Sequence, residues 1–222
     1  MSEYIVKILD SYYITHDVKQ FIVEKPKGYT FVSGQATDVS VNLPEWKNNL
    51  HPFTFTSLNE WDNLEFTIKI YPERNGVTAL LGKTNTGAEL ILHDVFGAIQ
   101  YKGPGVFIAG GAGITPFISI FRSLYKDNKI EGNSLIYSNK TSSDVILNDE
   151  LYKMLRDRFI KIFTRENVIG FLPRRIDRDF LVKNVSDFGQ HFYVCGPDEF
   201  VKDISKLLLD MGASAESLVL ED

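Results

Sequence analysis

The stretch VFIAGGAGITP, residues 106–116, decides the fold of this chain. It opens with four apolar residues, as in a parallel strand that is buried on both faces. A glycine loop follows, and then apolar residues recur with the spacing of one helix face: Phe117, Ile120, Phe121 and Leu124. Thr115 is expected to cap this helix, and Pro116 suits its first turn. The stretch therefore predicts a strand, a loop and a helix in immediate succession.

The glycine loop has the composition of a phosphate-binding turn at the edge of a parallel sheet. Glycines let the backbone approach a ligand closely, and free N–H groups at a helix start attract negative charge. Pro116 stands where the dinucleotide fingerprint G-x-G-x-x-G has its third glycine, and no P-loop Gly-Lys-Ser/Thr follows. The alternative interpretation is a flexible strand-to-helix turn that binds nothing.

Strand-like and helix-like stretches alternate after this loop. Strands are predicted at residues 134–138, 161–164, 192–195 and 218–220. Helices are predicted at residues 149–159, 176–185 and 200–211, the last of them closed by Gly212. Such alternation indicates a doubly wound parallel α/β sheet, which we place at residues 103–222, after a hinge at residues 101–105.

The first hundred residues have the period of half-buried strands instead. In LEFTIKIY, residues 64–71, apolar and polar side chains alternate. Shorter β-rich runs occur at residues 4–9, 21–24 and 37–41, and turn residues such as Asn75 and Gly76 separate the runs. Several short strands joined by turns predict an antiparallel barrel or sandwich over residues 1–100.

Cys195-Gly196-Pro197 repeats the pattern of the glycine loop, with a strand end, a tight turn and a helix start. It is therefore expected at the same carboxyl edge of the parallel sheet, where its thiol could lie against a bound ring. The alternative is a buried cysteine that only packs.

In the first half, HPFTFTS, residues 51–57, combines aromatic rings with hydroxyl groups. Phe53 and Phe55 fall on one face of a strand and Thr54 on the other. A flavin needs such an apolar platform with polar groups at its edge. The alternative is an ordinary amphipathic strand.

Length and composition exclude several classes of protein. The chain has 222 residues, enough for two domains of roughly 100 residues each. Its one cysteine cannot form an internal disulfide or hold a zinc ion or iron–sulfur cluster alone, and no metal site is expected. The net charge of -5 argues against a nucleic-acid partner. Without a signal peptide or a run of about 20 apolar residues, a cytoplasmic protein with no membrane span is expected.

Taken together, and in their order along the chain, the three segments 51–57, 110–116 and 195–197 resemble the ferredoxin–NADP reductase superfamily. The resemblance is strongest to its stand-alone flavodoxin-reductase-type and cytochrome-b5-reductase-type members, and it covers essentially the whole chain. It implies an FAD-binding barrel, an NAD(P)-binding domain and hydride transfer from NADPH or NADH to FAD. The implied partner is an electron acceptor, either a protein such as flavodoxin or ferredoxin or a small molecule.

The resemblance also implies roles for single residues. Thr54 would lie at the N5 edge of the flavin and Cys195 near the nicotinamide C4, so these two are the catalytic candidates. The implied FAD-binding residues are His51, Pro52, Phe53, Thr54, Ser57, Gly76, Val77 and Thr78. The implied nicotinamide-dinucleotide-binding residues are Gly110, Gly111, Gly113, Thr115, Pro116, Ser138, Asn139, Lys140, Cys195, Gly196 and Pro197.

The chain departs from the family pattern in three places. His51 replaces the arginine that neutralises the FAD pyrophosphate, and histidine is not permanently charged, so looser FAD binding or competition by FMN is expected. Residues 94–97, DVFG, replace G-P-F-G, and no C-terminal aromatic shields the flavin. Neutral Ser138 and Asn139 beside Lys140 slightly favour NADPH over NADH.

Three alternative functions stay open at this point. One is an electron-transfer subunit that works only within a multicomponent oxidoreductase. Another is a nucleotide- or flavin-binding module without redox turnover. The third is a binding protein with a non-flavin β-barrel and a Rossmann-like domain, which leaves the Cys-Gly-Pro turn unexplained.

Overall fold

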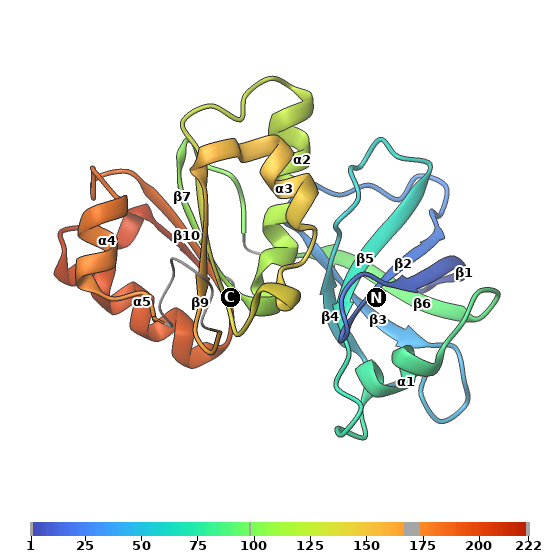
Figure 1. Cartoon of the computed structure of the whole chain (residues 1–222). Helices are drawn as coiled ribbons and strands as arrows, with labels where there is room; N and C mark the ends of the chain where they lie inside the picture. Colours follow the sequence, from blue (N-terminus) through green and yellow to red (C-terminus); the bar gives the residue numbers. More distant parts are fainter. Residues whose placement is uncertain (1, 98, 167–173, 221–222) are drawn as a thin grey trace.

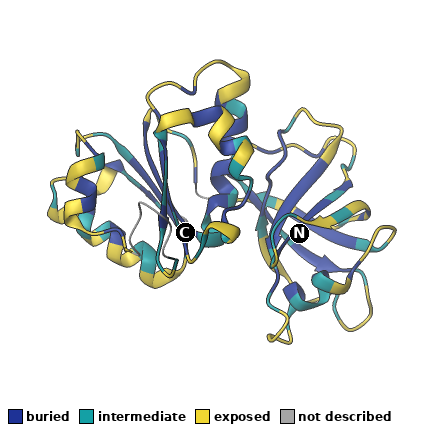
Figure 2. Ribbon diagram, in the orientation of Figure 1, coloured by how far each residue is buried: buried dark blue, intermediate teal, exposed yellow. Residues whose placement is uncertain are grey.

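The computed structural model describes residues 2–97, 99–166 and 174–220, and it shows two lobes side by side (Figure 1). One lobe is built on a six-stranded sheet and the other on a five-stranded sheet. The strands of both sheets are largely buried, and the exposed residues gather on loops and on outer helix faces (Figure 2). This is the predicted arrangement of an antiparallel barrel followed by a parallel α/β sheet.

The first lobe is an antiparallel barrel. Its strands are β1 (Tyr4–Tyr13), β2 (Val18–Glu24), β3 (Ala36–Val41), β4 (His51–Thr54), β5 (Asn63–Lys69) and β6 (Glu89–Phe96), in the order β4-β3-β6-β1-β2-β5. A bridge between Phe55 and Phe66 joins the end of β4 to β5, and the Thr56 N–H donates to the Glu65 carbonyl over 2.9 Å. These contacts between the two outer strands close the sheet around an apolar interior.

The second lobe is a parallel sheet with helices on both faces. Its strands are β7 (Gly105–Gly110), β8 (Ser134–Asn139), β9 (Phe159–Phe163), β10 (His191–Cys195) and β11 (Leu218–Leu220), in the order β11-β10-β7-β8-β9. Helices α2 (Thr115–Lys126) and α3 (Asn148–Leu155) pack into one apolar core, and α4 (Arg178–Asn184) and α5 (Asp198–Asp210) into another. The strand order reverses between β7 and β10, so their carboxyl ends flank the crevice where such sheets bind ligands.

Several predicted elements needed correction. The helix expected at residues 149–159 ends at Leu155, because Arg156 has a φ of 54° that no helix continues. The strand expected at residues 161–164 therefore begins earlier, at Phe159, which pairs with Leu135. Thr115 does not cap α2: a 3-10 turn, Gly111–Ile114, runs directly into the helix, and no side chain caps it.

Two elements were not anticipated at all. The sequence pattern predicts neither the strand β6 nor the helix α1 (Val77–Lys83). In α1, the backbone of Gly76 precedes the first helical residue and has extended torsions. The predicted FAD-binding segment 76–78 therefore forms the start of a helix.

Helix α2 lies between the two lobes and is buried on two sides. The predicted apolar face, with Phe117 and Phe121, packs against the parallel sheet. A second face carries Ser119, Arg122 and Lys126, at the spacing i, i+3 and i+7 of one helix side. Each of these three side chains is hydrogen-bonded to a residue of the barrel lobe. The helix thus joins the parallel-sheet lobe to the barrel.

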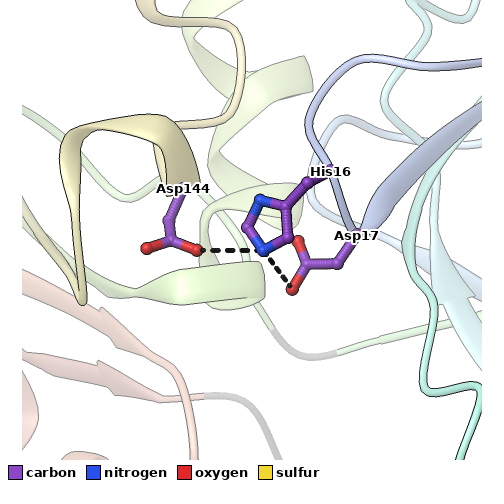
Figure 3. Close-up of side chains that lie close together, drawn as sticks. All are labelled: His16, Asp17 and Asp144. Atoms are coloured by element: carbon purple, nitrogen blue, oxygen red, sulfur yellow. Dashed lines mark ion pairs between the residues drawn. The ribbon is translucent and has the colours of Figure 1, made fainter.

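A second contact between the lobes involves the turn that connects β1 to β2. The His16 Nε2 atom lies 3.6 Å from Asp17 Oδ2 and 3.7 Å from Asp144 Oδ1, which belongs to the other lobe (Figure 3). The Lys69 ammonium is 2.6 Å from the same Asp17 oxygen. Because a lysine already neutralises this carboxylate, we read the cluster as an ionic contact between the lobes.

Candidate functional site

A crevice of about 1060 Å³ opens between the lobes, beside the carboxyl end of β10 and along α5. Pro52 and Thr54 of β4 line it from the barrel side, and Gly196, which follows β10, lines it from the other. The flavin segment and the Cys-Gly-Pro turn, predicted independently from distant parts of the sequence, therefore face one space.

A smaller cavity of about 300 Å³ adjoins the same strand. Most of the predicted FAD-binding residues line it: His51, Pro52, Phe53, Thr54, Gly76, Val77 and Thr78. Ala112 and Thr115 of the glycine loop line its far side. The structure thus brings the HPFTFTS segment, the start of α1 and the glycine loop around one cavity, which we call the flavin cavity.

The described side chains that line the flavin cavity carry positive charge and no acid. The basic ones are His51, Lys69 and Arg74, and none of the others is Asp or Glu. Lys69 is neutralised by Asp17, whereas the guanidinium of Arg74 lies 4.4 Å from the ring centre of Tyr71. This donor set fits a ligand with phosphates, because cations and backbone N–H groups are what a pyrophosphate requires.

Sequence reasoning missed Arg74. The sequence signal that could have found it is its position two residues before Gly76. The Gly76 N–H donates to the Arg74 carbonyl over 2.7 Å, so residues 74–76 form a tight turn. His51 is exposed and its ring stacks on Phe53 with centroids 5.1 Å apart. A permanent cation is therefore present in the flavin cavity although position 51 does not supply it.

The glycines of the two edge loops permit a close approach of backbone to backbone. A Cβ on Gly113 would lie 2.4 Å from the Cys195 carbonyl oxygen, and a Cβ on Gly196 would lie 3.3 Å from the Gly110 backbone. Gly111 differs: its φ is +54° and a Cβ there would meet nothing within 4 Å. Gly113 is thus required by packing against the Cys195 backbone, and Gly110 and Gly196 by packing against the Phe200 ring, whereas Gly111 is favoured by its positive φ alone.

Other predicted residues lie outside both cavities. Cys195 is 2% exposed, and its neighbour Gly196 reaches the crevice in its place. Ser57 is fully buried, and its hydroxyl accepts a hydrogen bond from the Glu65 N–H over 3.1 Å. Ser138, Asn139 and Lys140 lie at the carboxyl end of β8, where Lys140 is exposed. Gly110, Gly111, Gly113, Pro116 and Pro197 also lie outside the linings.

Arg122 is a further residue that the sequence analysis did not single out. Its guanidinium is 2.6 Å from Glu65 of the barrel and 2.6 Å from Glu150 of α3, and it also donates to the Thr56 carbonyl over 2.7 Å. Burial alone would lower the pKa of Arg122, but Glu150 and Glu65 outweigh burial and raise it. The side chain is therefore a permanent buried cation between the lobes.

Comparison with known families assigns both lobes. Residues 3–104 match an FAD-binding domain, and residues 107–206 match the oxidoreductase NAD-binding domain. Within the described residues, no helix has the length and apolarity that crossing a membrane requires.

Among characterised relatives, the reductase component of propane 2-monooxygenase from Mycolicibacterium smegmatis is 26% identical over 213 residues. The match covers 89% of this chain and 60% of that protein, so the chain spans less than two thirds of its length. NADH-cytochrome b5 reductase 2-A of Vanderwaltozyma polyspora is 29% identical, over 86% of this chain and 70% of that protein.

Solved structures share the fold across nearly the whole chain. A ferredoxin NADP+ reductase from Neisseria gonorrhoeae with bound FAD and NADP superposes with a TM-score of 0.85 at 23% identity, covering 99% of this chain and 98% of that one. The cytochrome b5 reductase domain of Ulva prolifera nitrate reductase gives 0.82 at 21% identity, covering 99% and 97%. These likenesses establish the two-lobed fold.

Proposed function

This chain belongs to the ferredoxin–NADP reductase superfamily, and on that premise we propose that it is a flavin reductase. It would oxidise NADPH or NADH, reduce FAD and hand the electrons to a separate acceptor. We also propose the division into an FAD domain over residues 1–100 and an NAD(P) domain over residues 103–222. In support, the last strand of the first sheet ends at Phe96 and the first strand of the second begins at Gly105.

One observation carries the proposal: Thr54 lines the flavin cavity and the crevice between the lobes at once. A ring seated against β4 would have its phosphate end among Arg74, Gly76 and Thr78, and its reactive edge open to the crevice. The crevice is where the reversed strand order of the second sheet receives a dinucleotide. Hydride donor and acceptor would therefore meet at Thr54.

Bound FAD supplies the two-electron chemistry that no side chain of this chain offers. The chain's own residues position and stabilise the reactants. Thr54, 8% exposed, has a hydroxyl to present to the ring edge, and the backbone of Gly111 to Thr115 offers N–H groups to the dinucleotide phosphates. Cys195 packs behind Gly196, so its proposed role is to shape the crevice wall near the nicotinamide.

The acceptor is proposed from the relatives. Propane 2-monooxygenase reductase component and NADH-cytochrome b5 reductase are names of proteins that pass electrons onward. We propose a redox protein as acceptor, with flavodoxin, ferredoxin and cytochrome b5 as the candidates to test. The name reductase component, which the first of these relatives carries, supports a second candidate function, an electron-transfer subunit of a multicomponent oxidoreductase.

The deciding experiment is the absorbance spectrum of the FAD-loaded protein without oxygen, before and after NADH or NADPH. Bleaching of the flavin bands by one nucleotide is the expected result, and it names the donor. Cytochrome b5, ferredoxin and flavodoxin are then added in turn to find the acceptor. Failure to take up FAD, or an FAD-loaded protein that neither nucleotide bleaches, would reject the reductase in favour of a binding module.

A further inference from the structure

Helix α2 connects the glycine loop to the barrel. Its first residue, Thr115, lines the flavin cavity, and Arg122 lies seven residues further along, roughly 10 Å at a helical rise of about 1.5 Å per residue. The helix is packed on its other side into the core of the nucleotide lobe, with Phe117 and Phe121 fully buried. The residues that bind Arg122 therefore also fix the position of the glycine loop relative to the barrel.

Arg122 is held by the barrel strands that frame the flavin cavity. One of its NH1 hydrogen bonds goes to the Thr56 carbonyl and the other to the Glu65 carboxylate, over 2.7 Å and 2.6 Å. Thr56 lies two residues beyond Thr54, and its hydroxyl donates to the same Glu65 oxygen over 2.7 Å. All of these groups are buried, so the geometry is fixed by hydrogen bonds that water does not compete for.

The remaining guanidinium nitrogens bind Glu150 of α3 over 2.6 Å and 2.9 Å. This fork-like contact fixes the plane of the guanidinium within the nucleotide lobe. Arg122 thus has one side anchored in its own lobe and the other in the barrel. Helix α2 and the Arg122 side chain therefore connect the glycine loop directly to the Thr56 carbonyl, two residues from Thr54.

We propose that Arg122 is the positioning residue that sets the distance between the glycine loop and Thr54, and through it the hydride-transfer geometry. The proposal rests on the proposed function only for its kinetic part. Lys126 supplies a matched comparison, because it also pairs across the lobes, with Glu60, from the next turn of the same helix, but with both side chains about half exposed. Exposed pairs contribute little, so Lys126 is not expected to set this distance.

The first test measures the distance between the two lobes in the absence of any cofactor. Lys83 and Lys153, exposed residues of different lobes, are replaced by cysteine and spin-labelled, with the unsubstituted labelled chain as the blank for Cys195. Double electron–electron resonance is expected to give a narrow distance distribution for this parent and for K126M. R122M is expected to broaden or shift it, and R122K to give an intermediate result, since an ammonium cannot reproduce the three-way contact.

The second test measures FAD affinity and the rate of anaerobic flavin reduction at saturating NADH or NADPH. R122M is expected to bind FAD within threefold of the parent and to be reduced about 10- to 100-fold more slowly, since misplacement by about 1 Å has effects of this size. R122K should be reduced faster than R122M but more slowly than the parent, and K126M should be reduced at the parent's rate. If R122M does not fold, R122K carries the same predictions at reduced size.

The outcomes separate this inference from the proposed function. A folded, FAD-loaded R122M or R122K with the parent's distance distribution and reduction rate would overturn the role of Arg122. A rate loss with an unchanged distribution would overturn it equally. A parent protein that neither nucleotide reduces would reject the reductase, while the distance measurement would still decide whether Arg122 positions the glycine loop.

Discussion

The Gly113 α-carbon faces the backbone of Cys195 so closely that a Cβ atom there would lie 2.4 Å from the Cys195 carbonyl oxygen. The two residues belong to different edge loops, the glycine loop and the Cys-Gly-Pro turn. Their contact fixes the position of the glycine loop against the turn whose Gly196 lines the crevice between the lobes. A substitution at this point must move one loop relative to the other.

Gly113→Ala is therefore expected to weaken dinucleotide binding as well as stability. Overpacking of this kind costs about 1–3 kcal/mol. Gly87→Ala is the matched control, because Gly87 has a φ of +90° and open space around it in a barrel turn. The backbone strain of an alanine at this position costs about 1–2 kcal/mol, a comparable loss, and does not affect the crevice. The midpoint temperature of thermal unfolding should fall in both variants. Titration with NADP+ or NAD+ should show a loss of affinity in Gly113→Ala alone.

Arg74→Gln is expected to weaken FAD binding by about 10- to 150-fold, since a charge-assisted hydrogen bond contributes about 1.5–3 kcal/mol. The binding constant of the variant should also depend less on salt concentration than that of the parent. Arg156→Gln is the control, because Arg156 likewise lies over a tyrosine ring, that of Tyr152, but in the other lobe. Quenching of FAD fluorescence on binding measures both. Equal affinity of Arg74→Gln and parent would show that Arg74 does not reach the phosphates.

The complementary substitution is His51→Arg, which restores the residue type that the family carries at this position. FAD is expected to bind several-fold more tightly, because a second permanent cation joins the flavin cavity. Unchanged affinity would mean that the exposed side chain at position 51 points away from the phosphates.

The strand, glycine loop and helix at residues 106–124 were predictable because each depends on local chemistry. The unbroken apolar run, the glycines and the 3.6-residue period all lie within one short segment. The end of α3 was not, since the left-handed torsion at Arg156, with φ 54°, falls on a residue type that seldom adopts it.

The contacts of Arg122 could not be predicted for a different reason. Its partner Glu65 is 57 positions away, and only the docking of the two lobes brings them together. On the sequence, Arg122 occupies the polar side of an amphipathic helix, where a solvated charge is the ordinary expectation. The same holds for Arg74, whose meaning depends on the cavity formed by β4 and α1.

The pH dependence of stability is expected to contain a contribution from Asp17. Burial would raise the pKa of this carboxyl group, but Lys69, together with His16 and Thr15, lowers it overall. The unfolded chain therefore takes up the proton first, near its ordinary pKa of about 3.9. The contribution is complete above that pH and is lost as the pH falls through the lower pKa of the folded state.

Asp17→Asn should accordingly be about 1 kcal/mol less stable than the parent at pH 7, a value typical of partly exposed pairs. Below about pH 4 the two should converge, because the parent then loses the same ion pair. Urea unfolding at pH 7, 5 and 3 measures the difference, with exposed Asp62→Asn as control. A difference at pH 3 as large as that at pH 7 would mean that the substitution disturbs packing instead of charge.

Thr54 and Thr78 should separate rate from affinity. Both line the flavin cavity and both are 8% exposed, but only Thr54 also borders the crevice. Thr54→Ala is therefore expected to slow flavin reduction about tenfold, the effect of one lost hydrogen bond of about 1.4 kcal/mol, with little change in FAD affinity. Thr78→Ala is expected to weaken FAD binding and leave the reduction rate of the loaded protein unchanged. Thr54→Ser, which keeps the hydroxyl, should recover most of the rate. Stopped-flow absorbance under anaerobic conditions measures the rates, and a normal rate for Thr54→Ala would remove Thr54 from the reacting edge and leave the meeting point of the two cavities without its proposed role.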